Sequence, residues 1–265
     1  MHLQTLSILP YCGAPPSPGT LFSRWNLDPY LIAALLALAA AYLVGVRRLV
    51  QRGRALPPPA PLAFAAGWVV AALALISPLC ALSVSLFAAR VGQHMILSLI
   101  AAPLLAAGLP PLPLRLRPAS GPFLAAGMFA LLIWFWHAPA PYALTFASTA
   151  AYWAMHVSVI AAAVWLWATL LETEAPRILP AVGAGVLSCV QMGLLGALLT
   201  FAPHPLYAPH ALTTVAWGLA PLTDQQLGGA IMWAPGGLVF LAAAMSGLAR
   251  LLAGGRGRDR RALAA

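Results

Sequence analysis

The sequence is short of charge and contains no lysine. Only 7% of its 265 residues are charged, and Asp and Glu together number 5. A soluble domain carries about 25% charged residues, so a water-facing surface over a chain of this length is excluded. Hydrophobic residues make up 62% of the chain instead. We therefore expect lipid to surround most of the protein.

Acidic residues and cysteines are too few for several kinds of chemistry. With 5 carboxylates in the whole chain, paired groups for acid–base catalysis have few candidates. The sequence also has no Ser/His/Asp arrangement and no phosphate-binding loop, so we expect no enzyme. Its three cysteines, Cys12, Cys80 and Cys189, form no CxxC motif. Zinc sites and thioredoxin-like chemistry therefore have no support.

Long hydrophobic runs predict the fold class. The runs are near twenty residues each, which is the length that crosses a bilayer as a helix. We expect an all-α bundle of about seven transmembrane helices at 29–253, after an irregular outer segment at 1–28 and before a basic tail at 254–265. The expected spans are 29–46, 62–80, 91–108, 122–136, 150–171, 181–201 and 229–252.

The arginines predict the orientation of the bundle. If the N-terminus lies outside, all 14 basic residues except Arg24 and Arg90 fall on the cytoplasmic side. Cytoplasmic loops are enriched in arginine and lysine, so we expect the N-terminus outside and the C-terminus inside a bacterial inner membrane. Topology then explains the net charge of +9 without nucleic acid. Cys12 and Cys80 would both lie on the outer side, and whether they pair is left open.

Imidazole and thioether groups gather in the outer half of this bundle. His94 lies in the first turn of the third span, His137 ends the fourth and His156 is about two turns into the fifth. Ionisable groups in a membrane usually face the bundle interior and mark function. Imidazole and thioether together suit copper, so we expect a copper-binding or copper-relay site below the outer surface. Its candidate ligands are His94, His137, His156, Met95, Met155, Met192 and Met232.

Each of these side chains also has a purely structural explanation. Methionine is an ordinary filler of hydrophobic cores. A histidine near the membrane surface, such as His204 or His210 in the long outer loop, can be wetted by lipid headgroups. Asp224 can cap the seventh span, and tryptophans such as Trp136 and Trp233 can belong to an aromatic belt.

Four motifs together resemble one family. They are Gln93-His94-Met95, Trp136-His137-x-Pro139, His204-Pro205-Leu206-Tyr207, and Asp224-Gln225-Gln226-Leu227-Gly228-Gly229 with Met232-Trp233. This pattern resembles the multi-span CtaG family of bacterial cytochrome c oxidase assembly factors, from about the second span to the seventh.

The resemblance implies a seven-span inner-membrane protein that a haem–copper oxidase needs, by helping its copper centre form. Copper is then the expected metal. Cytochrome c oxidase subunits, periplasmic copper chaperones and the lipid bilayer are the expected partners. Beyond the candidate ligands, we expect functional roles for Asp224, Gln225, Gln226, Trp136, Trp233, His204 and His210.

Two other functions fit the same histidines. His94 and His156 on facing helices could be axial ligands of a haem b, which makes a haem- or quinone-binding redox protein the first alternative. A copper or small-solute transporter is the second. It needs polar groups along a path to the inner side, and the inner halves of spans three to seven have almost none.

Overall fold

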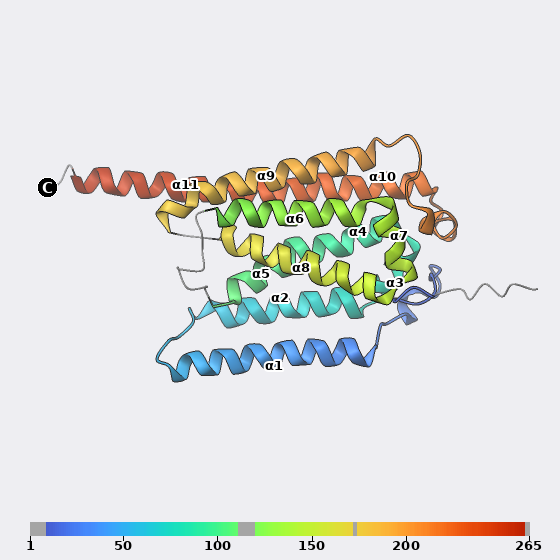
Figure 1. Ribbon diagram of the computed structural model, residues 1–265, viewed down its shortest axis with the longest axis horizontal. Coiled ribbons are helices and arrows are strands. Elements are labelled where there is room, and N and C mark those ends of the chain that lie inside the picture. The colour runs from blue at the N-terminus through green and yellow to red at the C-terminus, as the bar shows by residue number, and fades with distance from the viewer. Residues whose placement is uncertain (1–8, 111–119, 172–173, 263–265) are drawn as a thin grey trace, which may run out of the picture.

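The computed structural model describes residues 9–110, 120–171 and 174–262, and within these ranges the regular structure is helical throughout (Figure 1). Six helical segments are individually long and apolar enough to cross a membrane, and a bent pair of helices supplies a seventh. The expected all-α bundle of about seven spans is therefore confirmed.

Most helices run nearly parallel to one long axis, and the short α3 and α7 lie at one end (Figure 1). In chain order they are α1 (Pro29–Gln51), α2 (Pro59–Ile76), α3 (Leu79–Ser85), α4 (Phe87–Ile96), α5 (Ala102–Gly108), α6 (Gly121–His137), α7 (Pro139–Ala147), α8 (Thr149–Leu170), α9 (Ala175–Thr200), α10 (Pro221–Ile231) and α11 (Gly237–Ala262).

Two of the spans contain a π-helical turn. One at Leu97–Ala101 joins α4 to α5, and one at Met232–Gly236 joins α10 to α11. The second turn includes Pro235, which has no backbone N–H to continue the helical hydrogen bonds. Such turns often occur at functional sites, and both lie in spans that carry polar motifs, Gln93-His94-Met95 in one and Asp224-Gln225-Gln226 in the other.

The last span begins earlier than the sequence indicates. α10 starts at Pro221, whereas the hydrophobic run starts at 229. The difference arises because Asp224 and Gln225 are polar but buried. A span predicted from hydropathy therefore omits the first turns of α10. Proline at the first helical position provides the start signal there.

Adjacent glycines let α10 contact two neighbouring helices closely. A Cβ atom at Gly228 would lie 2.5 Å from the Phe87 ring of α4, and one at Gly229 would lie 2.7 Å from the backbone oxygen of Gly196 in α9. Neither distance is possible for a real Cβ atom. Small residues at these positions allow the close approach of neighbouring helices, and they hold the start of α10 against α4.

Gly229→Ala is expected to destabilise the bundle by roughly 1–3 kcal/mol, because the Gly196 oxygen belongs to the backbone and cannot rotate away. Gly92→Ala in α4 is the matched control, since a Cβ there meets nothing within 4 Å and alanine favours the helix by up to about 1 kcal/mol. Thermal unfolding of both variants in one detergent checks this. Equal unfolding midpoints would contradict the packing argument.

The segment before α1 is fastened to the end of the bundle where α3 and α7 lie (Figure 1). Cys12 and Cys80 form a disulfide with their Cα atoms 5.5 Å apart, so the pairing that the sequence left open is present. The Asn26 backbone N–H donates to the Ile76 oxygen at 2.8 Å. The described N-terminal part and the end of α11 lie at opposite ends of the bundle, as an odd number of spans requires.

Candidate functional site

Three histidines from three helices meet inside the bundle. His94 of α4, His137 at the end of α6 and His156 of α8 are all buried. The ring centres of His94 and His156 are 5.2 Å apart, and those of His94 and His137 are 6.3 Å apart. The structure thus brings together the three histidines that the sequence distributes over separate spans.

Backbone hydrogen bonds fix the orientation of two of these rings. His137 Nδ1 lies 2.8 Å from the Ile133 oxygen, and His156 Nδ1 lies 3.0 Å from the Tyr152 oxygen. A carbonyl oxygen only accepts hydrogen bonds, so each Nδ1 carries the proton and each Nε2 keeps a lone pair. Metal-binding histidines are commonly oriented by such bonds from the other ring nitrogen.

The Nε2 atoms of His94 and His156 are buried and have no hydrogen-bond partner. An unsatisfied buried polar group costs about 1–3 kcal/mol, so a ligand for these lone pairs would explain them. Two imidazoles that bind one ion at about 2.0 Å have ring centres roughly 5–6 Å apart, which the 5.2 Å of this pair fits.

His94 and His156 already have the spacing to share one ion, whereas the three histidines together do not. Within the described part of the chain, no three His, Cys, Asp or Glu side chains form a group that could hold a metal ion. His137 is the outlying member, because its ring centre is 6.3 Å from that of His94. A third imidazole would reach the ion only after a shift of the His137 side chain.

A buried arginine lies one turn before His94 in α4. Arg90 is 2% exposed, and its Nη2 donates to Thr145 Oγ1 at 2.6 Å. The four-residue spacing places Arg90 and His94 on one helix face. Cation–π contacts hold the guanidinium at 4.3, 5.0 and 5.8 Å from the ring centres of Phe146, Tyr142 and Tyr152.

No carboxylate forms an ion pair with Arg90 among the side chains that the structure describes, and Arg90 Nε has no hydrogen-bond partner. From the sequence, Arg90 is only an outer charge that sets topology, whereas the structure shows it inside the bundle. The signal that could have found it is its spacing to His94 within an otherwise apolar helix, since ionisable groups in such helices usually face the interior.

Asp224 caps α4 and not its own helix. Its Oδ2 accepts from the Phe87 N–H at 2.6 Å, and its Oδ1 accepts from the Ala88 N–H at 3.1 Å. A carboxylate at this position satisfies free backbone donors and interacts favourably with the helix dipole. The cap that the sequence suggested for the seventh span therefore acts on α4, the helix that carries Arg90 and His94.

Gln225 fastens the outer loop to the bundle. Its Oε1 accepts from the Leu206 N–H at 2.6 Å, and its Nε2 donates to the Leu199 oxygen at 3.3 Å. The neighbouring loop residue Tyr207 donates its hydroxyl to the His137 backbone oxygen at 2.8 Å. The two motifs that contain Gln225 and Tyr207 thus support the end of α6, where His137 lies.

A comparison with known families explains why these motifs occur together. The family model described as cytochrome c oxidase caa3 assembly factor (Caa3_CtaG) matches residues 40–253. The chain belongs to this family. The resemblance drawn from the four motifs is confirmed, and the match includes α4, α6 and α8 with their histidines. No curated protein and no solved structure matches the chain.

The candidate methionines lie near different parts of the site. A Cβ atom at Gly236 would lie 3.6 Å from Met95 Sδ and 3.7 Å from Met192 Sδ, so both sulfurs border the same point of the π-helical turn. Met155 Sδ lies 3.9 Å from Arg90 Nη2. All four candidates are buried: Met95, Met155, Met192 and Met232.

The other predicted residues of the assembly factor differ in their exposure and contacts. His204 is exposed in the outer loop, and Gln226 is half-buried. Trp233 is 45% exposed, as expected of an aromatic side chain near lipid. Trp136 donates its Nε1–H to Ser158 Oγ at 3.0 Å, which ties α6 to α8.

His210 is buried in the outer loop of the assembly factor. Its Nε2 lies 2.6 Å from the Tyr142 hydroxyl. Burial, together with the positive charge of Arg90, lowers the pKa of His210 to about 3, so the imidazole is neutral at pH 7. His210 therefore contacts Tyr142, one of the rings beside Arg90, and does not join the other three histidines.

Proposed function

We propose that this assembly factor holds a copper ion, as cargo, between His94 and His156 and thereby helps form the copper centre of a haem–copper oxidase. The observation that carries the proposal is the pair of buried, unpartnered Nε2 atoms on rings 5.2 Å apart. Neutral imidazole is a good ligand for copper. The nearby charge of Arg90 favours Cu(I) over a divalent ion, because repulsion grows with the charge of the ion.

The thioether groups would supply a second position for the ion. Met95 and Met192 place their sulfurs beside Gly236, and thioether ligands select Cu(I). Met95 follows His94 directly in α4, so one turn of this helix carries a member of each pair, although successive side chains project in different directions. A copper ion passing between them would move within one region of the protein, as a relay requires.

The proposed location is the bacterial inner membrane, with the N-terminal segment on the outer side. The distribution of arginines supports this orientation. The Cys12–Cys80 disulfide also supports it, because disulfides persist in oxidising compartments. In this position the assembly factor, acting without catalysis, would receive copper from periplasmic chaperones and contact the oxidase subunits in the bilayer.

The packing of the rings disfavours a haem between His94 and His156. The two rings are in edge contact at an interplanar angle of 75°, and the Tyr152 ring centre lies 4.2 Å from that of His156. A porphyrin with both histidines as axial ligands would have to separate these rings. A Soret band in the purified protein would overturn this reasoning.

Oxidase activity under limiting copper tests the proposed function. His94→Ala and His156→Ala are each expected to lower oxidase activity roughly tenfold or more, while the variant proteins reach normal levels in the membrane. Added copper is expected to restore part of the activity. Leu131→Ala, which changes an exposed side chain of α6, is the control and should behave as wild type. A fully active oxidase in both site variants would contradict the proposal.

A further inference from the structure

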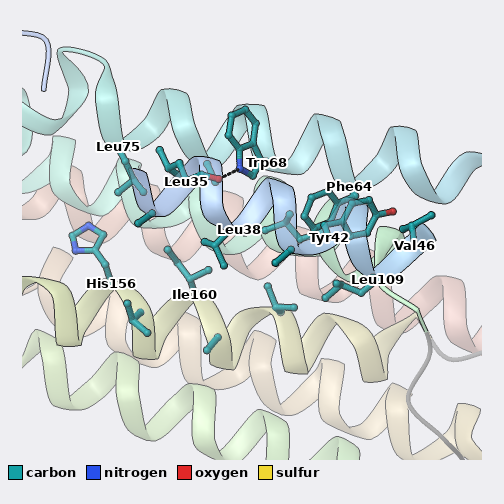
Figure 2. Close-up of a pocket in the computed structure, with 18 of the residues that line it drawn as sticks. Leu35, Leu38, Tyr42, Val46, Phe64, Trp68, Leu75, Leu109, His156 and Ile160 are labelled. Carbon is teal, nitrogen blue, oxygen red and sulfur yellow. Dashed lines mark hydrogen bonds between the residues drawn. The ribbon is translucent and has the colours of Figure 1, made fainter. Parts of the chain in front are cut away.

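A large groove separates α1 from the rest of the bundle. It lies between α1, α2 and α8 and has a volume of about 1050 Å³. Figure 2 shows its length, with His156 near one end and Val46 and Leu109 near the other. The groove opens between helices that span the membrane, so lipid and not water surrounds it.

The first helix touches the bundle at only a few points across this groove. Trp68 of α2 donates its Nε1–H to the Leu35 backbone oxygen at 3.1 Å, which Figure 2 draws as a dashed line. Tyr42 stacks on Phe64 with ring centres 3.5 Å apart. Between these contacts and α8 the groove is continuous, so α1 and α8 are separated along much of their length.

Apolar side chains make up most of the wall, and the charged groups lie near the ends. Leu38, Ile160 and Val164 are among the apolar side chains, whereas Arg48 and Arg52 lie at the end away from His156. A helix rises about 1.5 Å per residue, so the stretch of α1 that lines the groove is roughly 30 Å long. That length equals the hydrocarbon thickness of a bilayer.

We propose that the groove binds an anionic phospholipid, with its phosphate at Arg48 and Arg52 and its acyl chains directed along α1 and α8 toward His156. A guanidinium binds phosphate oxygens through charge-assisted hydrogen bonds. Basic pockets between membrane helices on the cytoplasmic side are a known setting for anionic headgroups. The apolar wall provides the surface that acyl chains cover.

The charges disfavour two other occupants. A further transmembrane helix would cover the apolar wall but would bring no phosphate to Arg48 and Arg52. An isoprenoid quinone would place its head near a polar group such as His156 and would gain nothing from Arg48 and Arg52. The arginine pair therefore favours a phospholipid.

Lipid retention by the purified full-length protein tests the headgroup contact. The protein is equilibrated in nanodiscs of equal phosphatidylglycerol and phosphatidylethanolamine, extracted into mild detergent, and its bound lipid is measured by native mass spectrometry. Wild type is expected to retain phosphatidylglycerol. The double variant Arg48→Ala/Arg52→Ala is expected to retain roughly tenfold less. Arg47→Ala/Arg54→Ala makes the same charge change outside the groove and should retain it like wild type.

A second pair of variants tests the position of the acyl chains. Ala41→Trp fills the groove, because Ala41 lines it, whereas Ala40→Trp adds the same side chain to the lipid-facing surface of α1. Only Ala41→Trp is expected to lose the bound lipid. Equal retention in the two arginine variants, equal retention in the two tryptophan variants, or a retained quinone would each overturn the proposal. None of these measurements depends on copper, so a failure of the lipid proposal can be distinguished from a failure of the proposed copper function.

Discussion

Replacing Asp224 by alanine is expected to lower the thermal unfolding midpoint of the protein by roughly 5–15 °C. The carboxylate is 0% exposed and accepts hydrogen bonds from the Phe87 and Ala88 backbone N–H groups. Alanine would leave both donors buried without a partner, at about 1–3 kcal/mol each. For a protein of this size, each kcal/mol lowers the midpoint by about 2–4 °C.

Two further variants make the Asp224 experiment specific. Asp224→Asn keeps one acceptor oxygen and should lose less stability than Asp224→Ala. Asp28→Ala removes the same charge from the start of α1, where Asp28 accepts hydrogen bonds from the Tyr30 N–H at 2.9 Å and from the Tyr11 hydroxyl. The loss of each bond costs about 1 kcal/mol. If Asp224→Ala is no more destabilising than Asp28→Ala, the buried cap does not hold α4 in place.

The second large effect is expected on the choice of metal. In Arg90→Met, the affinity for Zn(II) should rise roughly 50-fold more than the affinity for Cu(I). At a separation of roughly 7 Å between the ion and the guanidinium, each unit of ion charge is repelled by about 2.4 kcal/mol at an effective dielectric constant of 20. The divalent ion has one more unit of charge, and 1.4 kcal/mol corresponds to tenfold in affinity.

The matched control for Arg90→Met is Arg90→Lys, which keeps the positive charge. Competition titrations of both variants with Zn(II) and Cu(I) measure the ratio of the two affinities. Arg90→Lys should keep the wild-type ratio, and Arg90→Met should shift it toward Zn(II). If both variants give the same ratio, the charge of Arg90 does not act on the bound ion.

The spans were predictable because each depends on a local property of the chain. Apolar runs near twenty residues long give the number of membrane spans. Asp28 followed by Pro29 marks the start of the first span, and the structure begins α1 at the same residue. The short helices α3 and α7 were not predicted. Each is apolar and separated from its neighbouring spans by only a residue or two, so hydropathy does not distinguish it from them.

The candidate site was predictable only in part. His94, His137 and His156 stand out because imidazole is rare in apolar spans, and the sequence assigned them to one region. The sequence could not show that Asp224 caps α4 and not its own helix, because its hydrogen-bond partners on α4 are far away in the sequence. Likewise, the aromatic groups around Arg90 come from α7 and α8, and only the packed bundle shows that they hold a cation.

The most direct test of the copper proposal is a Cu(I) titration of the purified, metal-free protein and its histidine variants. Wild type and His204→Ala are expected to bind Cu(I) with equal affinity. His94→Ala and His156→Ala should each bind it at least roughly tenfold more weakly, with unfolding midpoints close to wild type. Equal Cu(I) affinity in all four proteins would show that the two buried imidazoles do not hold the metal.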